Sequence, residues 1–194
     1  MRKIAFALAL GLAAMPVAAL AQAEAAPPAG ASQANKMAYF FVWDDAAGKI
    51  VSLAQAIPAE KYDWRPAEGV RSVGEAFQHI SAGVYYLTLM VGVQPPAGHP
   101  QSFEEAGALE KQTSKEACLA SLERALAFGR GVVDGATPEL LAKQIDFFGT
   151  PTDGRSVLLA LNAHLHEHLG QEIAYARSIG VVPPWSMPQP KTDG

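Results

Sequence analysis

The chain has 194 residues, of which 49% are hydrophobic and 18% are charged, and its formal net charge at pH 7 is −4. This composition favours a single globular domain with a hydrophobic core and excludes a disordered chain. The acidic balance provides no basic surface for a phosphate backbone, so we expect no nucleic-acid partner.

Residues 1–21 are typical of a signal peptide. Arg2 and Lys3 precede an apolar run, and an A-x-A pattern after it predicts cleavage behind Ala21. A retained membrane anchor is the alternative, but Pro16 interrupts the apolar run. Cleavage would leave 13 Lys+Arg against 19 Asp+Glu, a net charge of −6. We therefore expect a periplasmic or secreted protein without membrane contact after cleavage.

The single cysteine, Cys118, excludes an internal disulfide. Its position four residues before Leu122 in a helical pattern predicts a buried, inert thiol; a reactive thiol is the alternative.

The mature chain begins with an Ala-, Pro- and Gly-rich stretch, residues 22–35, that predicts a flexible N-terminus. An apolar stripe at helical spacing then predicts a first helix over residues 36–57, which Pro58 ends. The connection to residue 71 carries Trp64, which we expect to fold back on one end of the domain.

The second helix is predicted to follow an N-cap at Ser72, with Glu75 completing a capping box, and to run to about Val91. Residues 92–113 are rich in Pro and Gly and predict an irregular connection. Ser114 is the next predicted N-cap.

The third helix follows Ser114 and ends at Gly135, and a second irregular stretch comes after it. The fourth helix is predicted from about Arg155 to Ile179, with Gly180 closing it. Since no strand pairs are apparent, the fold class is all-α: a four-helix bundle over residues 36–185, followed by a flexible tail, residues 186–194.

Two histidines of the fourth helix, His164 and His168, are one turn apart, so their Cβ atoms lie about 6 Å apart on one face. That spacing lets both imidazoles bind one ion, although two surface histidines would give the same pattern. His166 points to the other side, and His99, in a Pro/Gly loop, is interpreted as a surface residue. His79 on the second helix can complete the set or be a core histidine with its own partner.

Two ordered segments of the chain resemble the DinB family. The first segment contains Tyr62-Asp63-Trp64-Arg65-Pro66, Gly69, Arg71-Ser72-Val73-Gly74-Glu75 and His79-Ile80. The second contains His164-x-x-x-His168-x-Gly170-Gln171, Tyr175, Arg177, Gly180 and Pro183-Pro184. Family members share a W-R-P…S-x-x-E-x-x-x-H-I segment and an H-x-x-x-H-x-G-Q…R-x-x-G…P-P segment.

The resemblance implies an up-down-down-up bundle and a divalent metal ion, often zinc or nickel, held by His79, His164 and His168. It also implies a metal-dependent hydrolase or transferase, or a thiol-dependent transferase or isomerase, and it is compatible with a homodimer. Leu169 departs from the family pattern, because many members carry Arg there. The export signal argues against a cytosolic thiol as cofactor.

Three neutral imidazoles would leave the ion an open coordination position, which suits a catalytic site. Glu75 and Glu172, each one turn from a histidine, are the candidate catalytic acids or bases. For Glu75 the alternative is the capping box, and for Glu172 it is an ion pair or a hydrogen bond to an imidazole.

The leading hypothesis is an exported metal-dependent hydrolase that acts on an unidentified small molecule. A non-catalytic metal-binding or interaction module is the alternative, and a helical bundle without an ion is a third. The sequence contains no phosphate-binding glycine loop and no dinucleotide fingerprint.

Overall fold

The structure, a computed structural model, describes residues 29–187, and the predicted signal peptide lies outside this range. Its helices are α1 (Ala29–Ala56), α2 (Val73–Met90), α3 (Phe103–Ala108), α4 (Lys115–Asp134), α5 (Pro138–Ala142) and α6 (Gly154–Ser178). Three 3-10 turns, η1 (Ala59–Lys61), η2 (Leu109–Lys111) and η3 (Pro184–Ser186), and two strands, β1 (Gln144–Phe147) and β2 (Thr150–Asp153), complete the described elements.

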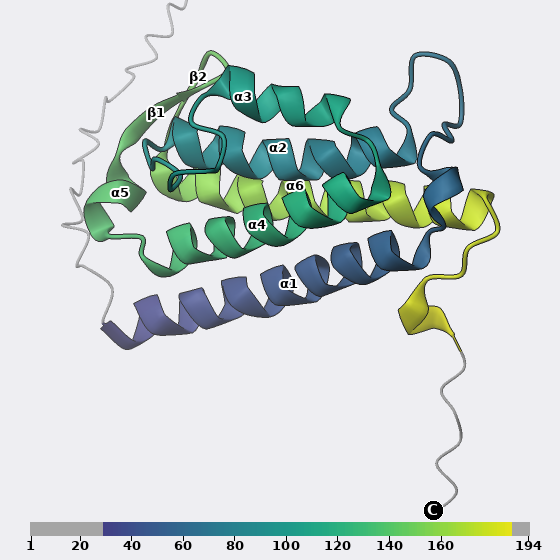
Figure 1. Ribbon diagram of the computed structural model, residues 1–194. Helices are drawn as coiled ribbons and strands as arrows, with labels where there is room; N and C mark the ends of the chain where they lie inside the picture. The colour runs from purple at the N-terminus through teal and green to yellow at the C-terminus, as the bar shows by residue number, and fades with distance from the viewer. Residues whose placement is uncertain (1–28, 188–194) are drawn as a thin grey trace, which may run out of the picture.

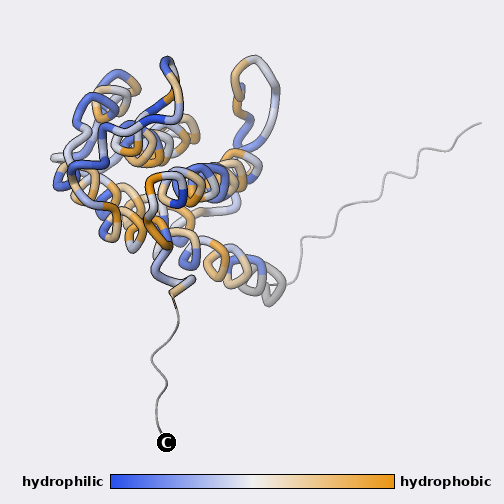
Figure 2. Tube along the Cα trace, turned by 90° about the vertical axis from the view of Figure 1, so that its right-hand side faces the viewer, coloured by the Kyte–Doolittle hydropathy of each residue, from blue (hydrophilic) through white to orange (hydrophobic). Residues whose placement is uncertain are grey.

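The four long helices α1, α2, α4 and α6 form the body of the molecule (Figure 1). α2 packs against α4 and α6, and α1 packs against the same two helices. Hydrophobic and hydrophilic residues are interspersed over the helical part of the chain (Figure 2), and the buried apolar side chains form one core. The largest fully buried apolar side chains include Trp43, Phe77, Ile80, Leu122, Leu161 and Leu165.

The predicted capping box at the start of α2 is confirmed. The Ser72 hydroxyl accepts a hydrogen bond from the backbone N–H of Glu75 (3.2 Å), and the Glu75 carboxylate accepts one from the backbone N–H of Ser72 (2.8 Å). This pair satisfies two backbone donors that a helix start leaves free. It fixes the first turn of α2, one turn before His79.

The ends of α4 and α6 agree closely with the prediction. Ser114 caps α4, and Gly135 follows its last residue. α6 begins at Gly154, with Asp153 as N-cap, and ends at Ser178, two residues before Gly180, whose φ of 81° only glycine adopts readily. Local capping signals were therefore sufficient to place these ends.

Cys118 is buried in α4, as predicted, and its thiol donates a long hydrogen bond to the Gly74 carbonyl (3.5 Å). Burial raises the pKa of the Cys118 thiol to about 12, so it stays protonated and inert near neutral pH.

Three expectations about secondary structure were wrong. α1 begins at Ala29, so residues 29–35, expected to be flexible, are helical. This stretch contains no proline and several alanines, the best helix formers. The connection 92–113, expected to be irregular, contains α3 and η2, and the stretch between α4 and α6 contains α5.

The same stretch also forms an antiparallel hairpin, in which β1 pairs with β2, although no strand pair was expected. Phe148 and Gly149 connect the strands with φ values of 51° and 86°. Positive φ at both positions is the pattern of the tight turn that suits a two-residue hairpin loop. Phenylalanine in place of the usual Asn or Asp hid this turn in the sequence.

No helix in the described range of the chain is both long enough and apolar enough to span a membrane.

Candidate metal centre

The structure brings three histidines from two helices together: His79 of α2 with His164 and His168 of α6. Each offers a ring nitrogen, and these three atoms lie within 4.8 Å of one another. The ring centroids are 4.4 Å apart for His164 and His168, 4.7 Å for His79 and His168, and 5.1 Å for His79 and His164. His166 is exposed and lies outside this cluster, as its position on the helix predicted.

A carboxylate from the connection between α2 and α4 orients His79. The Nδ1 atom of His79 lies 2.6 Å from Oε1 of Glu110, in η2. A ring N–H that donates to a carboxylate leaves Nε2 free to bind a metal, which is the usual arrangement around histidine ligands. The other Glu110 oxygen accepts a hydrogen bond from Nε of Arg71 (3.2 Å). Sequence reasoning missed Glu110, because no local pattern links it to His79, 31 residues away.

His168 is oriented by residues of its own helix. Its Nδ1 lies 2.8 Å from Oε1 of Gln171, and the Gln171 amide donates to the Tyr175 hydroxyl (2.9 Å). Tyr175 in turn packs edge-on against Trp64, with ring centroids 5.5 Å apart. Trp64 therefore folds back onto α6, as expected, and supports this chain of contacts.

His164 packs tightly against the opposite helix, α2. Its imidazole lies directly on Gly83 of α2, where any Cβ atom would collide with the ring. Its Nε2 atom is buried and has no hydrogen-bond partner among the described residues. An unpaired buried nitrogen costs free energy that a bound ion would offset.

The two histidines of α6 are held in the neutral form. Burial first, and then the neighbouring His168, His79 and Arg71, lower the pKa of His164 to about 4. Burial likewise lowers the pKa of His168, while the hydrogen bond that its ring donates to the Gln171 amide oxygen raises it. Neutral imidazole is the form that binds metals, so these rings need not lose a proton before they bind an ion near neutral pH.

Neither predicted catalytic carboxylate belongs to the histidine cluster. Glu75 accepts the capping hydrogen bond and two further hydrogen bonds from Arg65 (3.0 and 3.2 Å). These contacts, from Ser72 first and then Arg65, lower the pKa of Glu75. Its carboxylate therefore serves the helix start.

Glu172 is fully buried, and neither of its carboxyl oxygens has a hydrogen-bond partner in the described part of the chain. Burial raises the pKa of Glu172 well above its usual value, so the group stays protonated. Its charged form would raise the pKa of Tyr62 and Cys118, which indicates that it lies among core residues. The ion pair considered for it does not form among these residues.

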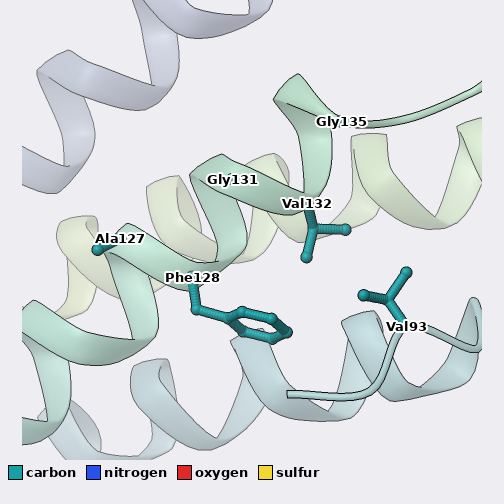
Figure 3. A pocket seen from close by; sticks show the side chains of 6 residues that line it. All are labelled: Val93, Ala127, Phe128, Gly131, Val132 and Gly135. Carbon is teal, nitrogen blue, oxygen red and sulfur yellow. The ribbon is translucent and has the colours of Figure 1, made fainter. Parts of the chain in front are cut away.

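A cavity lies elsewhere, on α4. It has a volume of about 360 Å³ and an apolar lining (Figure 3) of Val93, Ala127, Phe128, Gly131, Val132 and Gly135. Next to it, His99 is half-buried and not a plain surface residue: its Nδ1 lies 2.9 Å from the Tyr85 hydroxyl, and its ring packs against Phe128. None of these residues belongs to the histidine cluster.

Comparisons with known proteins agree with this architecture. A crystal structure of a DinB-like protein from Bacillus cereus ATCC 10987 is similar over 75% of this chain and 93% of that protein, with a TM-score of 0.58 and 19% identity. A second DinB-like protein, from Bacillus subtilis, is similar over 74% of this chain and 90% of that protein, with a TM-score of 0.54 and 22% identity. At these identities the likeness shows the fold alone. No curated protein matches the chain.

A family model also matches the sequence, from residue 43 to residue 171, and it describes the DinB superfamily. The match includes all three clustered histidines and most of the four long helices. This chain therefore belongs to the DinB superfamily.

Proposed function

We propose that this protein is an exported metal-dependent hydrolase that binds one divalent ion, zinc or nickel, on His79, His164 and His168 and acts on a small molecule. The observation that carries the proposal is the convergence of three imidazole nitrogens within 4.8 Å of one another. The N-terminal pattern of residues 1–21 supports the export part.

The donor set fits such an ion on three counts. Burial keeps His164 and His168 neutral, a contact from Glu110 orients His79, and the Nε2 atom of His164 is buried without a partner. Imidazole nitrogen suits zinc and nickel equally well, so the ligand types support both metals.

The chain's own residues would hold and orient the ligands. Glu110 fixes the ring of His79, Gln171 fixes that of His168, and Gly83 leaves room for the ring of His164. An ion bound by three neutral imidazoles keeps an open position, where it would polarise a substrate oxygen and lower the pKa of bound water.

A non-catalytic metal-binding module is the second candidate, and one observation favours it. Glu75 is engaged by Ser72 and Arg65, and Glu172 is buried away from solvent, so neither is a free base beside the histidines. The thiol-dependent transferase or isomerase rests on the family resemblance, and export to a compartment without cytosolic thiols argues against it.

We also propose the up-down-down-up order for the four long helices. The connection between α2 and α4, which contains α3 and η2, supports this order, because it is long enough to return the chain to the end of the bundle where α2 begins.

Elemental analysis of the purified protein tests the metal proposal. We expect one ion per chain in the wild type and in His166→Ala, whose ring is exposed, and loss of the ion in His168→Ala. A wild type that binds no zinc or nickel, or a His168→Ala variant with full occupancy, would contradict the proposal.

The hydrolase proposal needs a separate measurement. The loaded protein is incubated with a panel of chromogenic esters, amides and phosphate esters, beside His168→Ala. Turnover that depends on His168 supports a hydrolase, whereas full metal occupancy without turnover of any compound supports the non-catalytic module.

A further inference from the structure

Two arginines lie beside the start of α2, and they use their guanidinium groups differently. Arg65 and Arg71 have the same side-chain exposure, 40%. Arg65 donates from both Nη atoms, to Glu75 and to the Val70 carbonyl. Arg71 donates from Nε to Glu110, while its two Nη atoms make no hydrogen bond within residues 29–187. Arg71 therefore has two donors available to a ligand.

Arg71 also lies beside the metal centre. The Glu110 carboxylate bridges it to His79, with one oxygen bound to each side chain. A single carboxylate, that of Glu110, thus separates Arg71 from His79, and His79 and Glu110 remain partly open to solvent, with side-chain exposures of 21% and 27%.

The charges around the cluster favour a negative ligand once an ion is bound. The three imidazoles are neutral as ligands, and Arg71 and Glu110 compensate each other. Glu167, the residue before His168, is exposed, so water screens its charge. A divalent ion therefore leaves the site positive, and a partly dehydrated positive site attracts anions.

We propose that Arg71 holds an oxyanion of the substrate beside the three-histidine site, so that the substrates are small molecules with a carboxylate or phosphate group. The planar guanidinium matches both groups, because two parallel N–H donors can bind two oxygens. This inference rests on the proposed metal site. It assigns the positioning of the substrate to Arg71.

Isothermal titration calorimetry of the zinc-loaded, desalted protein tests it, with inorganic phosphate and acetate as separate probes. We expect at least one of the two anions to bind. Which of them binds more tightly distinguishes recognition of a phosphate group from recognition of a carboxylate group. Binding should be about tenfold weaker in Arg71→Gln, as for the loss of one charge-assisted interaction. Arg65→Gln is the matched control and should bind as the wild type does.

Metal content is measured first for each variant, so that the two proposals can fail separately. A wild type without metal overturns the proposed function, whereas a loaded wild type that binds neither anion overturns this inference alone. Equal anion binding by Arg71→Gln and wild type also overturns it. If Arg71→Gln fails to hold the metal because the Glu110 contact is lost, Arg71→Lys is measured instead. This variant keeps the positive charge but not the two parallel donors. Unchanged phosphate binding by Arg71→Lys would equally overturn the inference.

Discussion

Two neighbouring turns of α6 carry buried or half-buried polar side chains on the same face, and these side chains differ in their partners. His164 and His168 lie beside a third imidazole ring from α2, and Gln171 orients the ring of His168. Glu172, one turn further on, has no hydrogen-bond partner among the described residues. Helical spacing is the same in both cases. Whether a polar residue on an inward face forms a site thus depends on which groups other elements bring to it.

The two turns also respond to pH in opposite directions. Burial lowers the pKa of His164 and His168, so the folded state resists protonation there and loses stability as the pH falls. Burial raises the pKa of Glu172, so the folded state resists ionisation there and loses stability as the pH rises. Four variants would break or sharpen this comparison.

The largest effect is expected for the acid side of the metal-free protein. The pKa of His164 falls from 6.5 to about 4 on folding, so below pH 6.5 the unfolded chain binds a proton that the folded chain does not. Stability should therefore drop by up to about 3 kcal/mol between pH 6.5 and 4. Urea unfolding of the wild type and His164→Gln across this range measures it, and the variant should lose most of the dependence. The control His166→Gln should keep the pH dependence of the wild type. If the stability of His164→Gln falls with pH in parallel with that of the wild type, the assignment to His164 is wrong.

Glu110→Gln should weaken metal binding by about 10- to 100-fold, because the amide keeps the shape but not the charge that orients His79. Competition with a chromogenic chelator measures the affinity. Glu104→Gln, exposed in the adjacent α3, is the control and should bind as tightly as the wild type. Equal affinities in all three proteins would show that the Glu110 contact does not support the site.

Glu172→Gln should remove the alkaline-side instability. In the wild type, stability should fall as the pH rises above 4.5, because the unfolded carboxyl ionises and the buried one does not. Thermal unfolding at about pH 5 and about pH 8 measures this effect. The unfolding temperature of the variant relative to that of the wild type should be higher at about pH 8 than at about pH 5. Glu167→Gln, exposed on the same helix, should follow the wild type. If Glu172→Gln loses stability equally at both pH values, the buried carboxyl is not the cause.

The smallest effect is expected for Ser72→Ala, which removes the N-cap of α2 and should cost about 1 kcal/mol of unfolding free energy. The variant should still hold one ion per chain, since the cap lies outside the cluster. Chemical denaturation and elemental analysis check the two parts, and loss of the ion would mean that the cap positions His79 directly.

The parts of the molecule that follow from local rules were predictable. Apolar periodicity and caps such as Ser72 and Ser114 located the helices, because both signals act within a few residues. The pair His164 and His168 followed from the helical repeat. The inclusion of His79 came from the family resemblance, since nothing local shows that its helix lies against α6.

The remainder depends on contacts between distant segments. Glu110 reaches His79 because η2 packs on α2, and Gly83 is needed because a ring from α6 lies on it. The hairpin turn at Phe148 and Gly149 lacks the usual residue at its first position. Glu172 was predicted to be a catalytic acid or base, with an ion pair or a hydrogen bond to an imidazole as the alternative, and it stays unpaired among the described residues.

The origin of the ligands in α2 and α6 has a consequence for how the protein acquires its ion. The three nitrogens come from distant parts of the sequence and are neighbours only after α2 has packed against α6. The unfolded chain does not hold them together, so tight loading must follow folding. If the chain is exported, as proposed, and crosses the membrane unfolded, it picks up whichever metal the destination compartment supplies. Occupancy in cells would then report the metal supply outside the cytoplasm.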